Sequence, residues 1–308
     1  MREFEFIVTE EEANERIDKT IADLYEDFSR SYIQKLIKDN NVFVNDKNVK
    51  GSFVLKENDK VRFITPDAII PDIVPEDFPL DVIYEDDDVI IINKPKDMVV
   101  HPAAGHYSGT LVNGLMNYLK DGDSYKLSGI NGVLRPGIVH RIDKDTTGSV
   151  IVCKNDKAHE NLAEQFKEHS INRLYRAIVC GVIDEEEGVI NKPIGRDEKD
   201  RKKMSINARN SKSAITHYKV LERFDKYTYI ECKLETGRTH QIRVHMASIG
   251  HPVLGDEVYY DRKIPFKLNG QTLHAMTLGF IQPTTGEYIE TIAELPEYFK
   301  ELLEKIRK

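Results

Sequence analysis

The most informative stretch of the chain is Arg135-Pro136-Gly137-Ile138-Val139-His140-Arg141-Ile142-Asp143-Lys144-Asp145-Thr146-Thr147-Gly148. A short apolar run breaks here into a charged turn, and a second apolar run follows from Val150. Arg141 and Lys144 flank Asp143, so their charges favour its ionised carboxylate. Such an acid can act as a nucleophile or a base, although a solvated charged turn has the same pattern.

A second dense segment covers residues 236–245 and reads Thr-Gly-Arg-Thr-His-Gln-Ile-Arg-Val-His. Gly237 permits a tight turn, and Thr239 is a candidate cap for a helix over residues 239–249. His240 and His245 do not have the i, i+4 spacing of zinc-binding helices, and no Cys or acidic ligand accompanies them. We therefore expect these imidazoles to form hydrogen bonds or contact phosphate, and we expect no metal site.

Composition indicates a globular chain. Its 308 residues are 40% hydrophobic and 31% charged, which is enough for about two domains with buried cores. No apolar run has the length of a membrane helix, and the N-terminal stretch lacks the pattern of a signal peptide. The three cysteines lie far apart without a CxxC pair, which argues against a disulfide scaffold or a zinc finger. We expect a cytoplasmic protein with no membrane partner.

The net charge of −8 is unevenly distributed. Acidic residues gather between Pro66 and Val100, whereas basic residues slightly outnumber acidic ones from Arg16 to Thr65. Because the excess of acidic residues lies in one stretch, the net charge does not exclude a nucleic-acid partner, and it does not indicate one either.

The N-terminal part is punctuated as two short helices followed by a small sheet. Ile17, Ile21 and Leu24 have helical spacing, and Ser29 is a candidate cap for a second helix. That helix carries apolar residues on one face and basic residues on the other, namely Arg30, Lys35 and Lys38. Short strands are predicted at residues 42–44 and 60–64.

Four prolines then recur at positions 66, 71, 75 and 79, which predicts an irregular acidic linker. We place the first domain at residues 1–75, the linker at 66–80 across its boundary, and the second domain at 81–308.

The second domain consists mostly of strands. They are predicted at residues 89–93, 149–154, 175–183, 214–222 and 228–235, with helices at 157–169, 239–249 and 297–307. Strands and helices do not alternate regularly, so the pattern predicts an α+β fold. The run at residues 196–203 alternates basic and acidic side chains, and it is either a phosphate contact or a solvated loop.

Residues 140–148 resemble the catalytic motif of the RluA family of pseudouridine synthases. Further segments resemble that family in the same order along the chain: Asn93-Lys94-Pro95, Val100-His101-Pro102, residues 173–177, residues 236–245, Gly250-His251-Pro252, Gly255-Asp256 and Leu273-His274-Ala275. The first 75 residues resemble the S4 RNA-binding domain. The two-domain layout and the Asp143–Gly148 ending look most like the RluD-type enzymes, which modify large-subunit ribosomal RNA. Asp97 stands where many relatives carry Gly.

The resemblance implies a small S4-like domain of two helices and a sheet. It also implies a catalytic domain with a mixed, largely antiparallel sheet flanked by helices. The implied reaction is an isomerisation of uridine to pseudouridine in RNA, without cofactor or metal. Asp143 is the implied essential carboxylate; it could attack C1′, add to the uracil ring, or remove the 2′ proton.

The resemblance also assigns substrate-binding roles near Asp143. Arg243 is the implied partner of its carboxylate, and Tyr175 offers a ring on which uracil can stack. Arg141 takes the space of the flipped target base, and Ile242 packs under the ring. Without the resemblance, Tyr175 and Ile242 are typical of residues in a hydrophobic core, and Arg141 is typical of an exposed turn.

The implied partner is RNA, with 23S ribosomal RNA first and transfer RNA as the runner-up. Arg30, Lys35 and Lys38 would contact phosphates, which supply affinity rather than sequence information. We expect a monomer. Two alternatives remain: a catalytically silent RNA-binding or ribosome-assembly protein, and a glycoside hydrolase using Asp143 and Asp145.

Overall fold

The computed structural model describes residues 2–25, 28, 30–65, 73–103, 106–122, 124–130, 135–200, 202–206 and 208–308. The chain divides into two compact units, Met1–Ile70 and Pro71–Lys308. The predicted cap Ser29 lies outside the described residues, and so do residues 66–72 of the predicted linker.

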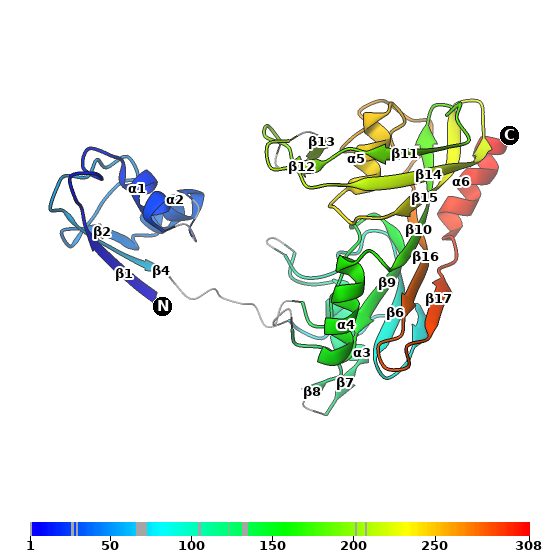
Figure 1. Ribbon diagram of the computed structural model, residues 1–308, viewed down its shortest axis with the longest axis horizontal. Coiled ribbons are helices and arrows are strands. Elements are labelled where there is room, and N and C mark those ends of the chain that lie inside the picture. The colour runs from blue at the N-terminus through cyan, green and yellow to red at the C-terminus, as the bar shows by residue number, and fades with distance from the viewer. Residues whose placement is uncertain are drawn as a thin grey trace. The chain divides into compact units, whose positions relative to one another are not determined.

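The small unit packs two helices on a sheet with the strand order β1-β4-β2-β3 (Figure 1). Its elements are β1 (Arg2–Ile7), α1 (Ile17–Leu24), α2 (Arg30–Lys38), β2 (Val42–Val44), β3 (Lys47–Asn48) and β4 (Lys60–Thr65). The apolar stripe of α2 is buried as the periodicity predicts, and so are Ile17 and Ile21 of α1, whereas Leu24 at the end of α1 is 45% exposed. The prediction that the sheet follows the helices is incomplete, because β1 precedes them and pairs with β4, and Phe4 stacks on Phe63 at 4.9 Å.

The large unit is built on a mixed sheet with the order β11-β14-β15-β10-β16-β9-β6-β5, and β17 also pairs with β16. All of these pairings are antiparallel except that of β9 with β16. Its strands are β5 (Val82–Glu85), β6 (Val89–Lys94), β9 (Thr147–Cys153), β10 (Asn172–Cys180), β11 (Glu187–Asn191), β14 (Ile215–Arg223), β15 (Tyr227–Leu234), β16 (Leu273–Ile281) and β17 (Tyr288–Ile292). Two small hairpins flank it: β7 (Lys120–Asp121) with β8 (Ser124–Tyr125), and β12 (Ile194–Arg196) with β13 (Met204–Ile206).

Helices cover both faces of this sheet. On one face, Ile90 and Val152 pack with α3 (Leu111–Tyr118) and α5 (Gln241–Ser248). On the other, Ile91 and Ile151 pack with α4 (Asp156–Lys167), and the β10 end of that face packs with α6 (Glu297–Arg307). Successive side chains of a strand point to opposite faces, so β9, which is buried along its whole length, carries an unbroken apolar run from Val150 to Cys153.

The α+β prediction is confirmed. Structure and sequence agree on α6 and, within a few residues, on α4 and α5. They differ on α3 and on β16, for which the sequence shows no clear periodicity: α3 contains Gly114 and Asn113, and β16 contains His274 and Gly279. Among the described residues, no helix combines the length and the apolar composition needed to cross a membrane.

Candidate active site

The loop that carries Asp143 is anchored where it enters β9. Thr146 accepts a hydrogen bond from Gln271 Nε2 at 3.1 Å, and Thr147 Oγ1 lies 2.8 Å from His274 Nδ1. His274 Nε2 lies 3.0 Å from the Ala293 carbonyl, which can only accept, so Nδ1 accepts from Thr147. These buried bonds fix the loop against β16.

Lys94 ties the same loop to the segment after β6. Its side chain is completely buried, and Nζ donates to the carbonyls of Pro95, Met98 and Lys144 at 2.8 to 2.9 Å. Asp97 has a φ of 64°, the left-handed conformation that explains glycine in relatives. Its carboxylate pairs with Lys144 at 2.6 Å.

Arg243 on α5 joins two carboxylates. Its Nη1 donates to Asp143 Oδ2 at 2.9 Å, while Nε and Nη2 form a bidentate pair with Asp256 at 2.7 and 2.9 Å. Burial disfavours the charged guanidinium, but the bonds to Asp256 and Asp143 outweigh it and raise the pKa of Arg243 above its ordinary value. Arg243 therefore stays charged and holds one oxygen of Asp143.

Asp256 is the residue that fixes Arg243. It is 1% exposed, and its Oδ1 also accepts the backbone N–H groups of Val258 and Tyr259 at 2.9 and 3.1 Å. Gly255-Asp256 is one of the segments that resemble the family, but the sequence alone assigns Asp256 no function. One feature of the sequence could have pointed to Asp256. It is an acid without an obvious partner, and its segment also contains the turn residue Gly255, whose φ is 81°.

The residues predicted to bind substrate lie around one hollow. Asp143, Arg141, Tyr175, Ile242 and Arg243 all line it, together with Thr146, Leu234, Arg238, His240, Gln241 and Leu273. A second hollow shares Asp143, Arg141, Arg243 and His240 and extends to residues 99–103. The structure thus brings together Arg141 and Arg243, which are 102 positions apart in the chain.

Tyr175 reaches the hollow from β10. Its pairing with β16 shifts register between Leu174 and Tyr175, and the side chain is 8% exposed. Burial raises the pKa of Tyr175, and Asp143 adds to this rise while Arg173 opposes it, so the phenol keeps its proton.

Two other members of the dense segments have supporting positions. His140 is half-buried, accepts the Ile151 N–H at 2.9 Å and stacks on Phe166, and the surrounding protein lowers the pKa of His140 to about 3 by desolvating the ring. His245 lies 2.9 Å from both Thr216 Oγ1 and the Lys192 carbonyl. Thr239 does not cap α5, because His240 occupies that position. Within the described ranges, no group of three or more His, Cys, Asp or Glu side chains is placed to hold a metal ion.

Asp145 lines the second hollow with Asp143, but Arg243 pairs with Asp143. Asp145 packs against Gly270, where an added Cβ would lie 2.6 Å from the Asp145 Cβ, and not against Arg243. Burial raises the pKa of Asp145, and the nearby Lys144 and Lys96 oppose this rise.

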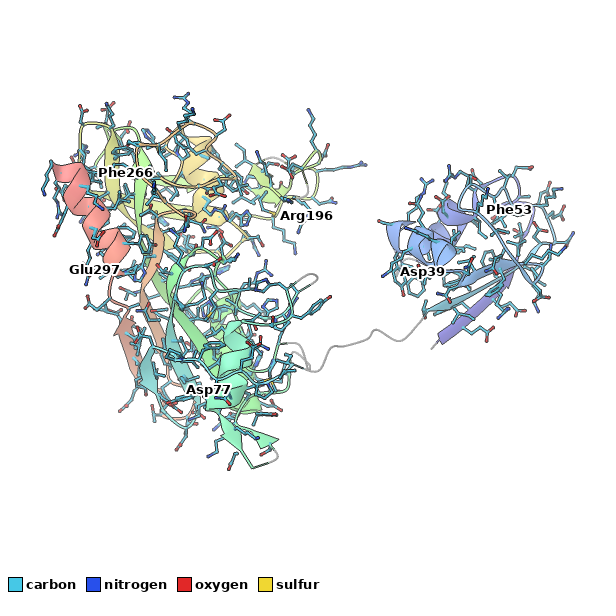
Figure 2. The ribbon with its side chains drawn as sticks, turned by 180° about the vertical axis from the view of Figure 1, so that it is seen from behind. Asp39, Phe53, Asp77, Arg196, Phe266 and Glu297 are labelled. Carbon is cyan, nitrogen blue, oxygen red and sulfur yellow. The ribbon has the colours of Figure 1, made fainter. Side chains whose placement is uncertain are left out.

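The basic residues predicted on α2 are exposed. Arg30 pairs with the buried Asp18 at 3.0 Å, and Asp18 also accepts from Arg16 and Gln34. In the large unit, Arg196 lies on the β12–β13 hairpin among long side chains that project from the surface (Figure 2). Arg201 of the same charged run lies outside the described residues.

Comparison with known proteins matches both units of the chain to described families. Residues 88–248 match the family described as RNA pseudouridylate synthase, and residues 15–61 match the S4 domain. A Bacillus subtilis protein, "Uncharacterized RNA pseudouridine synthase YlyB", is 51% identical over 100% of this chain and 99% of its own length. "Ribosomal large subunit pseudouridine synthase D" of Zymomonas mobilis is 43% identical, over 94% of this chain and 93% of its own. The solved structure "Human RNA Pseudouridylate Synthase Domain Containing 4" is 25% identical with a TM-score of 0.59, over 73% of this chain and 92% of its own.

The fold and the site therefore define an enzyme with an RNA-binding S4 domain and an isomerase domain. The chain belongs to the RNA pseudouridylate synthase family, and the predicted resemblance is confirmed.

Proposed function

We propose that this pseudouridine synthase acts on large-subunit ribosomal RNA and that Asp143 is its essential carboxylate. The substrate proposal draws on the relatives named large-subunit pseudouridine synthase D, which are 40 to 43% identical over nearly the whole chain. The observation that carries the role of Asp143 is its position: a half-buried acid in the hollow, with one oxygen held by Arg243.

The reaction breaks the bond between C1′ and N1 of uridine and forms a bond between C1′ and C5. The hydrogen on C5 leaves as a proton and N1 takes one up, so neither an oxidant nor water is consumed. Asp143 presents Oδ1 to the reacting nucleotide, because Oδ2 is bound to Arg243. A negative oxygen fixed beside the sugar stabilises positive charge that develops at C1′ when N1 leaves.

The other residues of the hollow hold the nucleotide. Tyr175 offers the face of its ring to the detached uracil, and Ile242 forms an apolar wall. Arg141 is exposed at the edge of both hollows and fills the space left when the target base leaves its helix. In the small unit, Arg30, Lys35 and Lys38 contact RNA phosphates.

The test uses a strain that lacks this gene, complemented with the wild type or with Asp143→Asn. Pseudouridines in its ribosomal RNA are mapped by carbodiimide modification and primer extension. We expect stops in large-subunit RNA that disappear in the deletion strain and return only with the wild type. Stops restored by Asp143→Asn would contradict the role of Asp143; changes confined to transfer RNA would contradict the choice of substrate.

A further inference from the structure

His240 has an unusual backbone for a residue with a side chain. Its φ of 56° lies in the left-handed region, at the N-cap position directly before α5, and its side chain makes no capping hydrogen bond to that helix. This conformation costs a non-glycine residue about 1 kcal/mol, and such strain is concentrated at functional sites. His240 lines both hollows that contain Asp143, so the strained backbone directs an imidazole to the reacting carboxylate.

Tyr259 determines which imidazole nitrogen carries the proton. The Tyr259 hydroxyl accepts the backbone N–H of Met204 at 2.8 Å and lies 2.8 Å from His240 Nδ1. Burial raises the pKa of Tyr259 to about 12, so the phenol keeps its proton and can donate it to Nδ1. Burial also lowers the pKa of His240, and the neutral ring therefore has its one proton on Nε2.

His240 Nε2 lies 3.9 Å from Asp143 Oδ1. This is too long for a direct hydrogen bond, and Asp143 Oδ2 is already bound to Arg243. A donor and an acceptor at this separation can both lie about 2.8 Å from one oxygen atom placed between them. A hydroxyl group, like a water molecule, can accept from the N–H and donate to the carboxylate at the same time.

We propose that His240 and Asp143 together bind the 2′-hydroxyl of the target uridine. Within an RNA chain the 3′ and 5′ oxygens are esterified, so the 2′-hydroxyl is the only free hydroxyl of the sugar. The inference rests on the function proposed above for Asp143 and deepens it, since it places that carboxylate against the ribose. It also gives the enzyme a means to distinguish RNA from DNA at the target position. Tyr259 is a positioning residue that acts through His240.

The experiment is a double-mutant cycle in which one change is made in the enzyme and the other in the substrate. Synthetic RNA covering the uridine mapped above carries ribose or 2′-deoxyribose at that one position and tritium at C5, which turnover releases to solvent. Single-turnover rates are measured for the wild type and for His240→Asn. Asn tolerates a positive φ, but its shorter amide does not reach the position of Nε2. We expect His240→Asn to lower the rate on the ribose substrate about tenfold or more.

On the 2′-deoxy substrate we expect His240→Asn and the wild type to differ by no more than about twofold, because the hydroxyl they contact is missing. An equal loss on both substrates, or no loss on the ribose substrate, would overturn the proposal. Tyr259→Phe should lower the rate less than His240→Asn and should have no further effect in that background; multiplying losses would exclude its positioning role.

His169 offers a matched control. It is exposed after α4 with a φ of 59°, so His169→Asn makes the same change on the same backbone and should leave the rate unchanged. Asp143→Asn separates the two proposals. An active Asp143→Asn enzyme would refute the function proposed for Asp143, whereas an inactive one beside a fully active His240→Asn enzyme would refute only the 2′-hydroxyl contact.

Discussion

Replacing Asp256 with Asn tests whether Asp256 positions Asp143 through Arg243 without itself reacting with the substrate. The substitution keeps the shape of the side chain but removes the charge that faces Arg243. One oxygen remains to accept from Arg243 Nη2 and from the N–H groups of Val258 and Tyr259. The 2.7 Å bond from Arg243 Nε is lost, and an amide N–H faces that donor instead.

Loss of a buried charge-assisted bond costs about 3 kcal/mol. For a unit the size of Pro71–Lys308 this lowers the melting temperature by about 6 to 12 °C. Arg243 then no longer has a fixed direction, and Asp143 moves with it. A displacement of about 1 Å at a reacting group costs roughly 10²-fold in rate.

Thermal unfolding of the full chain and single-turnover tritium release measure the two effects. Asp143→Asn is the control, because Asp143 is 22% exposed and its loss should remove activity while costing no more than about 1 kcal/mol of stability. An Asp256→Asn enzyme that unfolds earlier but reacts at the wild-type rate would refute the positioning of Asp143 through Arg243. An enzyme that unfolds like the wild type would refute the energetic argument.

Three further outcomes are expected. Burial opposes ionisation of Asp18, but hydrogen bonds from Arg16, Gln34 and Arg30 lower the pKa of Asp18 from 3.8 to about 2. Its carboxylate therefore stabilises the small unit fully above about pH 4, and this contribution of about 2 kcal/mol is lost as the pH falls towards 2. In urea unfolding, the free energies of unfolding of Asp18→Asn and the wild type should differ at pH 7 and converge near pH 2. Gly148 has a φ of 105°, and an added Cβ would lie 2.2 Å from the Ala275 carbonyl oxygen, so Gly148→Ala should cost at least about 3 kcal/mol in thermal unfolding. Gly122→Ala, with a φ of 60° and open space around it, should cost only about 1 kcal/mol, and equal losses would contradict the crowding at Gly148. Arg141→Ala should leave stability within about 0.5 kcal/mol of wild type and slow turnover more on a base-paired target than on a single-stranded one, where less energy is needed to expose the base; equal slowing on both would contradict its role in base flipping.

Much of the architecture is readable without coordinates. Periodicity predicts the apolar stripes of α1, α2 and α4 and the buried runs of β6 and β9. An element buried on one face has apolar residues at regular intervals, and an element buried on both faces has them in a continuous run. The family is recognised from the resemblance of residues 140–148 to a known motif, and that motif lies within one short segment of the chain. Periodicity does not predict strand β16, because its buried polar residues form hydrogen bonds with residues far away in the sequence. His274, for example, bonds Thr147 and Ala293.

The amino-acid sequence by itself determines the helices of the small unit, the α+β class and the family, because these depend on patterns within short segments. It does not distinguish Asp143 from Asp145 by physical argument, and it assigns no function to Asp256, Tyr259 or His240. Those functions depend on tertiary packing: α5 brings Arg243 to Asp143, 100 residues away, and the turn after Gly255 brings Asp256 to the other side of the guanidinium. A charge pair or a proton position is a property of atoms a few ångströms apart, and only the folded chain places those atoms together.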